Sequence, residues 1–101
     1  MTERVQFSRR ARKDLERLNA TTRSRVRAAL GGLVQTPPRS NLDIRSLTGR
    51  SPWLRLRVGN VRVILRPLTQ TEASLLRVES PGYLVERVID RRDLDDALRP
   101  L

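Results

Sequence analysis

The sequence contains no cysteine and no histidine. The first absence excludes disulfide bonds, thiolate metal sites and cysteine nucleophiles, and the second excludes any Ser–His or Cys–His catalytic pair within the chain. A zinc site is not expected, because cysteine and histidine are the main zinc ligands of proteins. We therefore expect neither a metal nor another cofactor, and any chemistry must rest on other polar side chains.

Aromatic residues and long apolar runs are also scarce. One Trp, one Tyr and one Phe occur in 101 residues, so a core must consist mainly of Leu and Val. No apolar stretch approaches the roughly 18–20 residues of a membrane span, and the N-terminal residues lack the apolar segment of a secretory signal. We expect one soluble, cytoplasmic domain over residues 1–101 that has no membrane partner.

Arginine is what the chain has in excess. Lys and Arg number 21 against 11 acidic residues, which gives a formal net charge of +10, and Lys13 is the single lysine. Residues 1–71 hold sixteen basic and four acidic residues, whereas residues 72–101 hold five and seven. Such a charge predicts an anionic partner, chiefly nucleic acid or an acidic protein, although it is also typical of GC-rich genomes and of solubilising surfaces.

Basic and apolar residues alternate through residues 53–66, on both sides of Gly59 and Asn60. This alternation predicts two half-buried strands, and the Gly-Asn pair predicts a tight hairpin that sets Arg57 opposite Arg62. One face of the hairpin is then apolar, and the other carries Trp53, Arg55, Arg57, Arg62, Ile64 and Arg66. Because like charges on facing strands destabilise a sheet, this basic face favours a function in polyanion binding.

The rest of the chain predicts a strand at residues 4–7 and then two amphipathic helices. Ser8 is a good cap for the first helix, Thr21 or Thr22 for the second, and the prolines after Thr36 end it. The later segments predict a connector at 37–52, a short helical turn that Thr71 caps and that runs through Leu75 and Leu76, a strand at 83–89 and a terminal helix at 93–98. We expect an α+β fold, with a small antiparallel β-sheet of about four strands and an N-terminal helical hairpin packed on one face. The face that carries the arginines is left open.

Several motifs in this order resemble the RelE/ParE superfamily of bacterial toxins from type II toxin–antitoxin systems. They are Phe7-Ser8, Leu47-x-Gly49, the run from Trp53 to Ile64, and Asp90-Arg91-Arg92. The short break between the helices is more similar to the RelE branch, whose members are mRNA interferases that mostly cut message in the ribosomal A site. The resemblance implies a RelE-like fold, a translation-inhibiting endoribonuclease acting on mRNA in the 30S A site, and a cognate antitoxin protein as partner.

The resemblance also implies a catalytic site of three arginines, Arg55, Arg62 and Arg91. Guanidinium groups are permanently charged and bind phosphate through two parallel hydrogen bonds, so they suit the negative charge of a phosphorane. Four further residues are candidates for RNA binding: Arg57, Arg66, Trp53 and Arg92. The indole of Trp53 can stack on a base or pack at the rim of the core.

Cleavage of RNA through its own 2′-hydroxyl also needs a proton acceptor. Arginine serves badly, because its pKa lies above about 12. Many active relatives have Tyr or His beside the arginine of the last strand, and this chain has neither there. The candidates for the general base are Glu86 and Asp90, or a group of the ribosome or the RNA. We expect weak or no cleavage of free RNA.

Three other interpretations stay open. The chain can be a ParE-like inhibitor of DNA gyrase, which the missing Tyr and His favour and the short helical hairpin opposes. It can also be a catalytically degenerate member that binds only RNA or its antitoxin. Finally, the basic face can be a solvated strand surface, or a docking surface for an acidic antitoxin helix.

Overall fold

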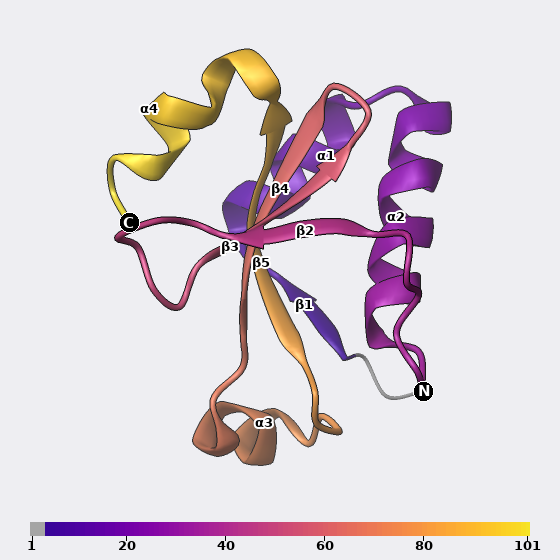
Figure 1. Ribbon diagram of the computed structural model, residues 1–101, viewed down its shortest axis with the longest axis vertical. Helices are drawn as coiled ribbons and strands as arrows, with labels where there is room; N and C mark the ends of the chain where they lie inside the picture. The colour runs from indigo at the N-terminus through magenta and orange to yellow at the C-terminus, as the bar shows by residue number, and fades with distance from the viewer. Residues whose placement is uncertain (1–3) are drawn as a thin grey trace.

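The computed structural model describes residues 4–101, which form an α+β fold. Its elements, in chain order, are β1 (Val5–Phe7), α1 (Arg9–Arg17), α2 (Ala20–Val34), β2 (Asp43–Ser46), β3 (Leu54–Val58), β4 (Val61–Pro67), α3 (Gln70–Leu76), β5 (Tyr83–Asp90), the 3-10 turn η1 (Arg91–Asp93) and α4 (Leu94–Leu98). Figure 1 shows α2 and α4 on opposite sides of the strands, with α3 beyond one end of the sheet.

The five strands form one sheet in the order β1-β5-β4-β3-β2. Two features differ from the predicted sheet. The edge strand β1 runs parallel to β5, so the sheet is mixed rather than antiparallel. The strand β2 lies inside the segment predicted as a connector, where Ile44 pairs with Leu56 of β3. Its four residues contain a single apolar side chain, which is too few to show the alternation that predicts a strand.

The hairpin of β3 and β4 has the predicted register. Leu54 pairs with Leu65, Arg57 with Arg62, and Val58 with Val61. Gly59 in the turn has a φ of 58°, a left-handed conformation that glycine adopts without the steric cost of a Cβ atom. The prediction of a two-residue turn at Gly59 and Asn60 is therefore confirmed, and it fixes which side chains share a face.

The helix caps agree with the prediction at one position and correct it at two. Ser8 caps α1, since its Oγ accepts a hydrogen bond from the Ala11 amide at 3.0 Å. Asn19, rather than Thr21 or Thr22, caps α2 through a bond from the Thr22 amide at 2.8 Å. Thr69, rather than Thr71, caps α3 in a capping box with Glu72. In both corrections the helix begins earlier, because an equally good capping residue stands before the predicted one.

The main core lies between one face of the sheet and the helical hairpin of α1 and α2. The helices contribute small and branched residues at helical spacing, and β4 contributes every second residue. Its buried members are Ala11, Leu15, Val26, Ala29, Leu30, Leu33, Leu56, Val61, Val63, Leu65, Val85 and Val88. This packing turns the other face of the hairpin, with its arginines, away from α1 and α2.

The prediction that the second face of the sheet is left open is wrong in part, because apolar residues and a helix cover some of it. Ile64 and Ile89 lie on it, yet they are 0% and 7% exposed. Helix α4 packs against β5 and contributes the buried residues Ala97 and Leu98. Arg50 holds the end of the helix, because its Nη1 donates to the Leu98 carbonyl at 2.7 Å. The arginines therefore share their face with a small apolar cluster. Over residues 4–101, no helix has the length and apolarity that crossing a bilayer requires.

Candidate nucleic-acid interface

Four arginines gather at the turn end of the β3–β4 hairpin, and we call Arg55, Arg57, Arg62 and Arg91 the arginine cluster. The first three come from facing strands, with Arg57 directly opposite Arg62. Arg91 comes from the end of β5, where its backbone amide donates to the Asn60 carbonyl at 2.8 Å. This bond ties the start of η1 to the hairpin turn. The structure thus brings together all three arginines predicted to be catalytic.

Arg62 is the centre of the arginine cluster. It is only 9% exposed, and its Nη1 donates to the carbonyls of Gly59 and Val61 at 2.9 and 3.1 Å. Burial lowers the pKa of Arg62, and the positive charges of Arg57, Arg55 and Arg91 lower it further. Since no buried side-chain nitrogen of the described residues lacks a partner, Nε and Nη2, which bond to no protein group there, reach solvent. They can receive an anion.

Asp43 is the counter-ion of the cluster. Its Oδ1 lies 3.2 Å from Nη2 of Arg55, whose side chain is 16% exposed, and 3.8 Å from Nε of the exposed Arg45. Sequence reasoning missed this residue because it lies in the unpredicted strand β2. One signal was present, since Asp43 is the only acidic residue between Glu16 and Glu72. A single carboxylate leaves most of the positive charge of the arginine cluster unbalanced.

Arg57 and Arg91 are the exposed members of the cluster. Within residues 4–101, neither guanidinium forms an ion pair or a hydrogen bond with another side chain. Both are therefore free to reach a ligand without first breaking a protein contact.

Arg66 and Trp53 lie on the same face but form a separate group further from the turn. Arg66 binds Glu72 of α3 through two parallel bonds of 2.7 and 2.8 Å. Its guanidinium also lies over the Trp53 ring, 5.8 Å from the centroid. The hydrogen bonds from Arg66, together with the weaker effect of the bond from the Thr69 amide, lower the pKa of Glu72 to about 2. The predicted RNA-binding residue Arg66 is thus engaged within the protein, and the structure does not bring it into the arginine cluster.

The two predicted base candidates have different surroundings. Asp90 accepts hydrogen bonds from the amide and Nε of Arg92 at 2.9 and 3.0 Å, which lower its pKa and make it a weaker proton acceptor. Glu86 is the extra residue of a β-bulge, because the register of β5 against β4 shifts beside it. Its negative charge contributes to raising the pKa of Arg66 and of Arg87. Arg92 itself is 83% exposed at the side chain.

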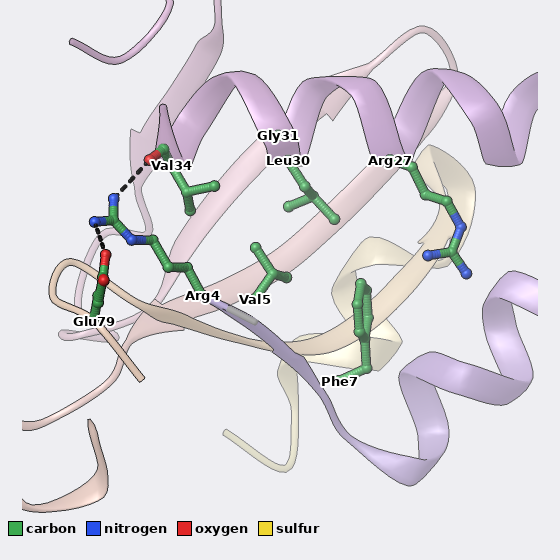
Figure 2. Close-up of a pocket in the computed structure, with 8 residues that line it drawn as sticks. All are labelled: Arg4, Val5, Phe7, Arg27, Leu30, Gly31, Val34 and Glu79. Carbon is green, nitrogen blue, oxygen red and sulfur yellow. Dashed lines mark hydrogen bonds and ion pairs between the residues drawn. The ribbon is translucent and has the colours of Figure 1, made fainter. Parts of the chain in front are cut away.

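A separate apolar groove lies on the helix side of the sheet, between β1 and α2 (Figure 2). Its volume is about 280 Å³, and its apolar lining consists of Val5, Phe7, Leu30 and Val34. Arg4 closes one end, where it bonds to the Val34 carbonyl at 2.9 Å and to Glu79 at 2.8 Å. Arg27 closes the other, 6.0 Å from the centroid of the Phe7 ring. The protein therefore has a basic surface and an apolar groove on different sides.

The fold is similar to that of archaeal toxins solved together with their antitoxins. One match is the RelB-RelE antitoxin-toxin complex from Methanococcus jannaschii, with a TM-score of 0.67 and 21% identity over 92% of this chain and 98% of that chain. Another is the RelE-RelB complex from Pyrococcus horikoshii OT3, with a TM-score of 0.63 and 22% identity over 90% and 97%. At these identities the likeness establishes a RelE-like fold.

A family comparison goes further than the fold. The family model described as "ParE toxin of type II toxin-antitoxin system, parDE" matches residues 5–81. The chain belongs to this family, and it is a toxin of a type II toxin–antitoxin system within the RelE/ParE superfamily, as the sequence predicted. The matched part contains the whole β3–β4 hairpin, whereas Arg91 lies beyond it. No curated protein sequence matches the chain.

Proposed function

We propose that this toxin is a ribosome-dependent mRNA endoribonuclease, an mRNA interferase that inhibits translation, and that its arginine cluster holds the scissile phosphate. The observation that carries the proposal is Arg62, a nearly buried arginine held among like charges. Its pKa is lowered by burial and by Arg57, Arg55 and Arg91, and a bound phosphate would relieve that repulsion. A chain that keeps such a costly arrangement has a use for an anion at this point.

In the proposed reaction the 2′-oxygen attacks phosphorus and the 5′-oxygen leaves. The solvent-facing Nε and Nη2 of Arg62 would form the two-pronged contact with the phosphate, while Arg55 and Arg91 stabilise the charge of the phosphorane. Arg57 would bind the neighbouring backbone, and Trp53 and Arg92 would contact the RNA around it, while Arg66 stays bound to Glu72. These residues position and neutralise the substrate, which accounts for much of phosphate-ester catalysis.

The proton transfers are what ties the proposal to the ribosome. Asp90 already accepts hydrogen bonds from Arg92, and its lowered pKa makes it a poor acceptor for a hydroxyl proton. Glu86 lies at the bulge of β5, away from the hairpin turn. The proton of the 2′-hydroxyl would then pass to a group of the ribosome or of the RNA in the 30S A site, and a group of the same surroundings would protonate the leaving 5′-oxygen. Free RNA is a poor substrate on this account, and the protein acts in the cytoplasm.

The proposed partner is a cognate antitoxin. The two solved structures compared above are antitoxin–toxin complexes, which supports such a partner for this chain. An acidic segment of the antitoxin laid over the arginine cluster would neutralise Arg57 and Arg91 and exclude RNA. The apolar groove between β1 and α2 offers a second surface for apolar side chains of the same partner.

A second candidate function is inhibition of DNA gyrase without cleavage of RNA. The family model favours it, because the model is that of ParE toxins. The absence of histidine from the chain is also compatible with a protein that performs no proton transfer. In that case the arginine cluster would be a protein-binding or antitoxin-binding surface.

One experiment separates these functions. Expression of the wild-type toxin in a bacterial host is expected to arrest growth. Primer extension should then map breaks within the translated part of mRNAs, at a fixed position within the cleaved codons. On purified ribosomes, Arg91→Ala should slow cleavage by about a hundredfold, which is typical of losing one transition-state donor. Arg99→Ala is the matched control, since Arg99 is exposed and paired with Asp96 at 3.4 Å; it should cleave normally.

The contrary outcomes point to the other interpretations. Growth arrest with induction of the DNA-damage response and intact mRNA would contradict the ribonuclease proposal and support inhibition of DNA gyrase. Expression without any growth defect would indicate a degenerate member. We expect the cognate antitoxin to be a short acidic protein encoded beside the toxin. Its coexpression should restore growth, and failure of this rescue would count against the assigned partner.

A further inference from the structure

Both backbone polar groups of Trp53 are hydrogen-bonded within the protein. Its amide donates to the Arg50 carbonyl at 2.9 Å, and its carbonyl accepts from the Leu47 amide at 3.0 Å. Arg50 is itself bound to the end of α4 at Leu98. The backbone of Trp53 is therefore held by two hydrogen bonds, in addition to the contacts of its side chain.

The indole ring is held as well, by a chain of three groups. The Arg66 guanidinium lies over one face of the ring at 5.8 Å from the centroid. Glu72 fixes the plane of that guanidinium with two bonds of 2.7 and 2.8 Å. Glu72 is in turn fixed by the capping box of α3, where it accepts from the Thr69 amide at 2.9 Å. Each group orients the next, so these contacts favour one orientation of the ring.

Next to Trp53 the surface is hollow. A depression of about 540 Å³ is lined by Trp53, by Ser46 at the end of β2 and by the loop before Trp53, which contributes the hydroxyl residues Thr48 and Ser51. A hollow with an aromatic wall and polar edges suits a flat heterocycle that carries hydrogen-bonding groups. A second depression, of about 310 Å³, adjoins the arginine cluster at Arg57 and Asp43, and its wall carries the charged residues Arg25 and Arg39 in place of an aromatic ring.

The spacing between Trp53 and Arg55 suits two successive groups of one RNA strand. Trp53 precedes β3, and Arg55 is the second residue after it, so both side chains lie on the same face about 7 Å apart along the strand. That spacing is close to the separation of successive groups in an extended single strand of RNA. A phosphate held by Arg55 and Arg62 would therefore bring a neighbouring base to the indole.

We infer that Trp53 is a stacking platform for one base of a single-stranded RNA, and that Arg66 and Glu72 are positioning residues that hold the ring for it. This inference rests on the proposed RNA binding by the arginine cluster. It assigns a role to Trp53 and Arg66, which lie on the same face but outside that cluster. The outer face of the ring receives the base, and the inner face stays on Arg66. Glu72 keeps Arg66 in the protein instead of releasing it to a phosphate.

The test uses the intact protein and a short 2′-O-methyl RNA, which cannot be cleaved. Trp53 is the only tryptophan, so quenching of its emission reports stacking at this one position. Binding is measured independently by the anisotropy of a dye on the oligomer. An abasic oligomer of equal length carries the same phosphates without bases. We expect saturable quenching by the RNA and none by the abasic oligomer.

Variants of Trp53 add a measure of affinity. Trp53→Ala should weaken binding of the RNA by about five- to a hundredfold, the range for loss of one base–aromatic stack, and should leave the abasic oligomer unaffected. Trp53→Phe should restore most of the affinity. Binding of both oligomers without any difference in quenching would overturn the platform and leave the proposed function standing. Binding of neither oligomer would overturn both.

Glu72→Gln tests the positioning role. Loss of the carboxylate frees Arg66 and adds one positive charge to the protein, so the abasic oligomer should bind equally well or better. The RNA should bind about threefold more weakly, because the ring is no longer held. The ratio of the two affinities therefore falls, whereas a purely structural defect would weaken both. Asp96→Asn is the control, since it also adds one charge and breaks an exposed pair; a fall of the ratio in this control would overturn the assignment.

Discussion

At the residue scale, Arg62 shows how the fold holds charge in an unfavourable place. The residue is nearly buried, and three other arginines lower its pKa. Two backbone carbonyls, from Gly59 and Val61, partly offset this by accepting bonds from Nη1. Asp43 offsets more of it through Arg55. The remaining repulsion is a stability cost that the protein keeps, and its removal should therefore stabilise the fold.

This cost can be measured at Arg57, the exposed residue directly opposite Arg62. Arg57→Gln removes one of two like charges that face each other, so the free energy of unfolding should rise by about 0.5 kcal/mol in low salt. In 1 M salt the screening length is about 3 Å, and the gain should disappear. Urea unfolding at both salt concentrations measures the effect, and binding of a non-cleavable RNA should weaken in the same variant.

The control for this prediction is Arg99→Gln, which breaks a pair with Asp96 and should give no gain in either salt. A loss of stability on Arg57→Gln that is equal in low and high salt would contradict the repulsion. It would show instead that the aliphatic part of the Arg57 side chain packs on the sheet.

At the scale of elements, the β3–β4 hairpin could be predicted in detail. Alternation defined both strands, and a two-residue turn leaves no freedom in the register, so Arg57 had to face Arg62. Strand β2 could not be predicted in the same way, because its pairing is decided by the neighbour β3 and not by its own pattern. Helix α4 was predicted, but its position over Ile64 and Ile89 depends on packing that the local sequence does not encode.

The contacts that were missed are those between residues far apart in the sequence. Asp14 of α1 is 7% exposed and binds Arg87 of β5 at 2.8 Å, across 73 positions of the chain. Its Oδ2 also accepts the amide of Val88 at 2.9 Å, next to the bulge. The sequence shows an acid within a basic helix and gives no partner for it. Likewise, the pairing of Asp43 with Arg55 became visible only once β2 was placed beside β3.

Helix α3 provides a prediction on pH, because Glu72 attaches it to β4 through Arg66. The pKa of Glu72 is lowered from 4.5 to about 2 in the folded protein. A lowered pKa of an acid adds stability that is complete above the ordinary value and is lost as the pH falls toward the folded value. The stability difference between wild type and Glu72→Gln should therefore be constant from neutral pH down to about 5 and shrink toward pH 2.

Urea unfolding at a series of pH values measures this difference. Arg66→Met should remove the same pH-dependent part, since the bonds from Arg66 are the main cause of the shift. In the double variant the further change from Glu72→Gln should be close to pH-independent. A difference between wild type and Glu72→Gln that does not change with pH between 5 and 2 would contradict the role given to the pair.

At the scale of the whole molecule, the charge is divided between two parts of the chain. Seven of the eleven acidic residues lie in residues 72–101, and the basic excess lies before them. The fold joins the two parts at the hairpin turn, where Arg91 from the acidic part completes the arginine cluster. A net charge of +10 would attract RNA to any surface, so the proposed site requires that binding depend on position and not on total charge.

Salt dependence distinguishes these two modes of binding. Each phosphate neutralised on a single strand contributes about 0.7 to the slope of log K against log salt. Arg91→Ala should lower the slope for a non-cleavable RNA by about that amount, because a free guanidinium of the arginine cluster is lost. Arg99→Ala removes the same formal charge, but from a residue already paired with Asp96, so its slope should equal that of the wild type. Equal slopes in both variants, each below the wild type, would mean that RNA binds diffusely over the basic surface. The affinities are measured by the anisotropy of a dye-labelled, non-cleavable RNA at several salt concentrations. Their salt dependence determines whether this toxin recognises RNA at one site or only attracts it.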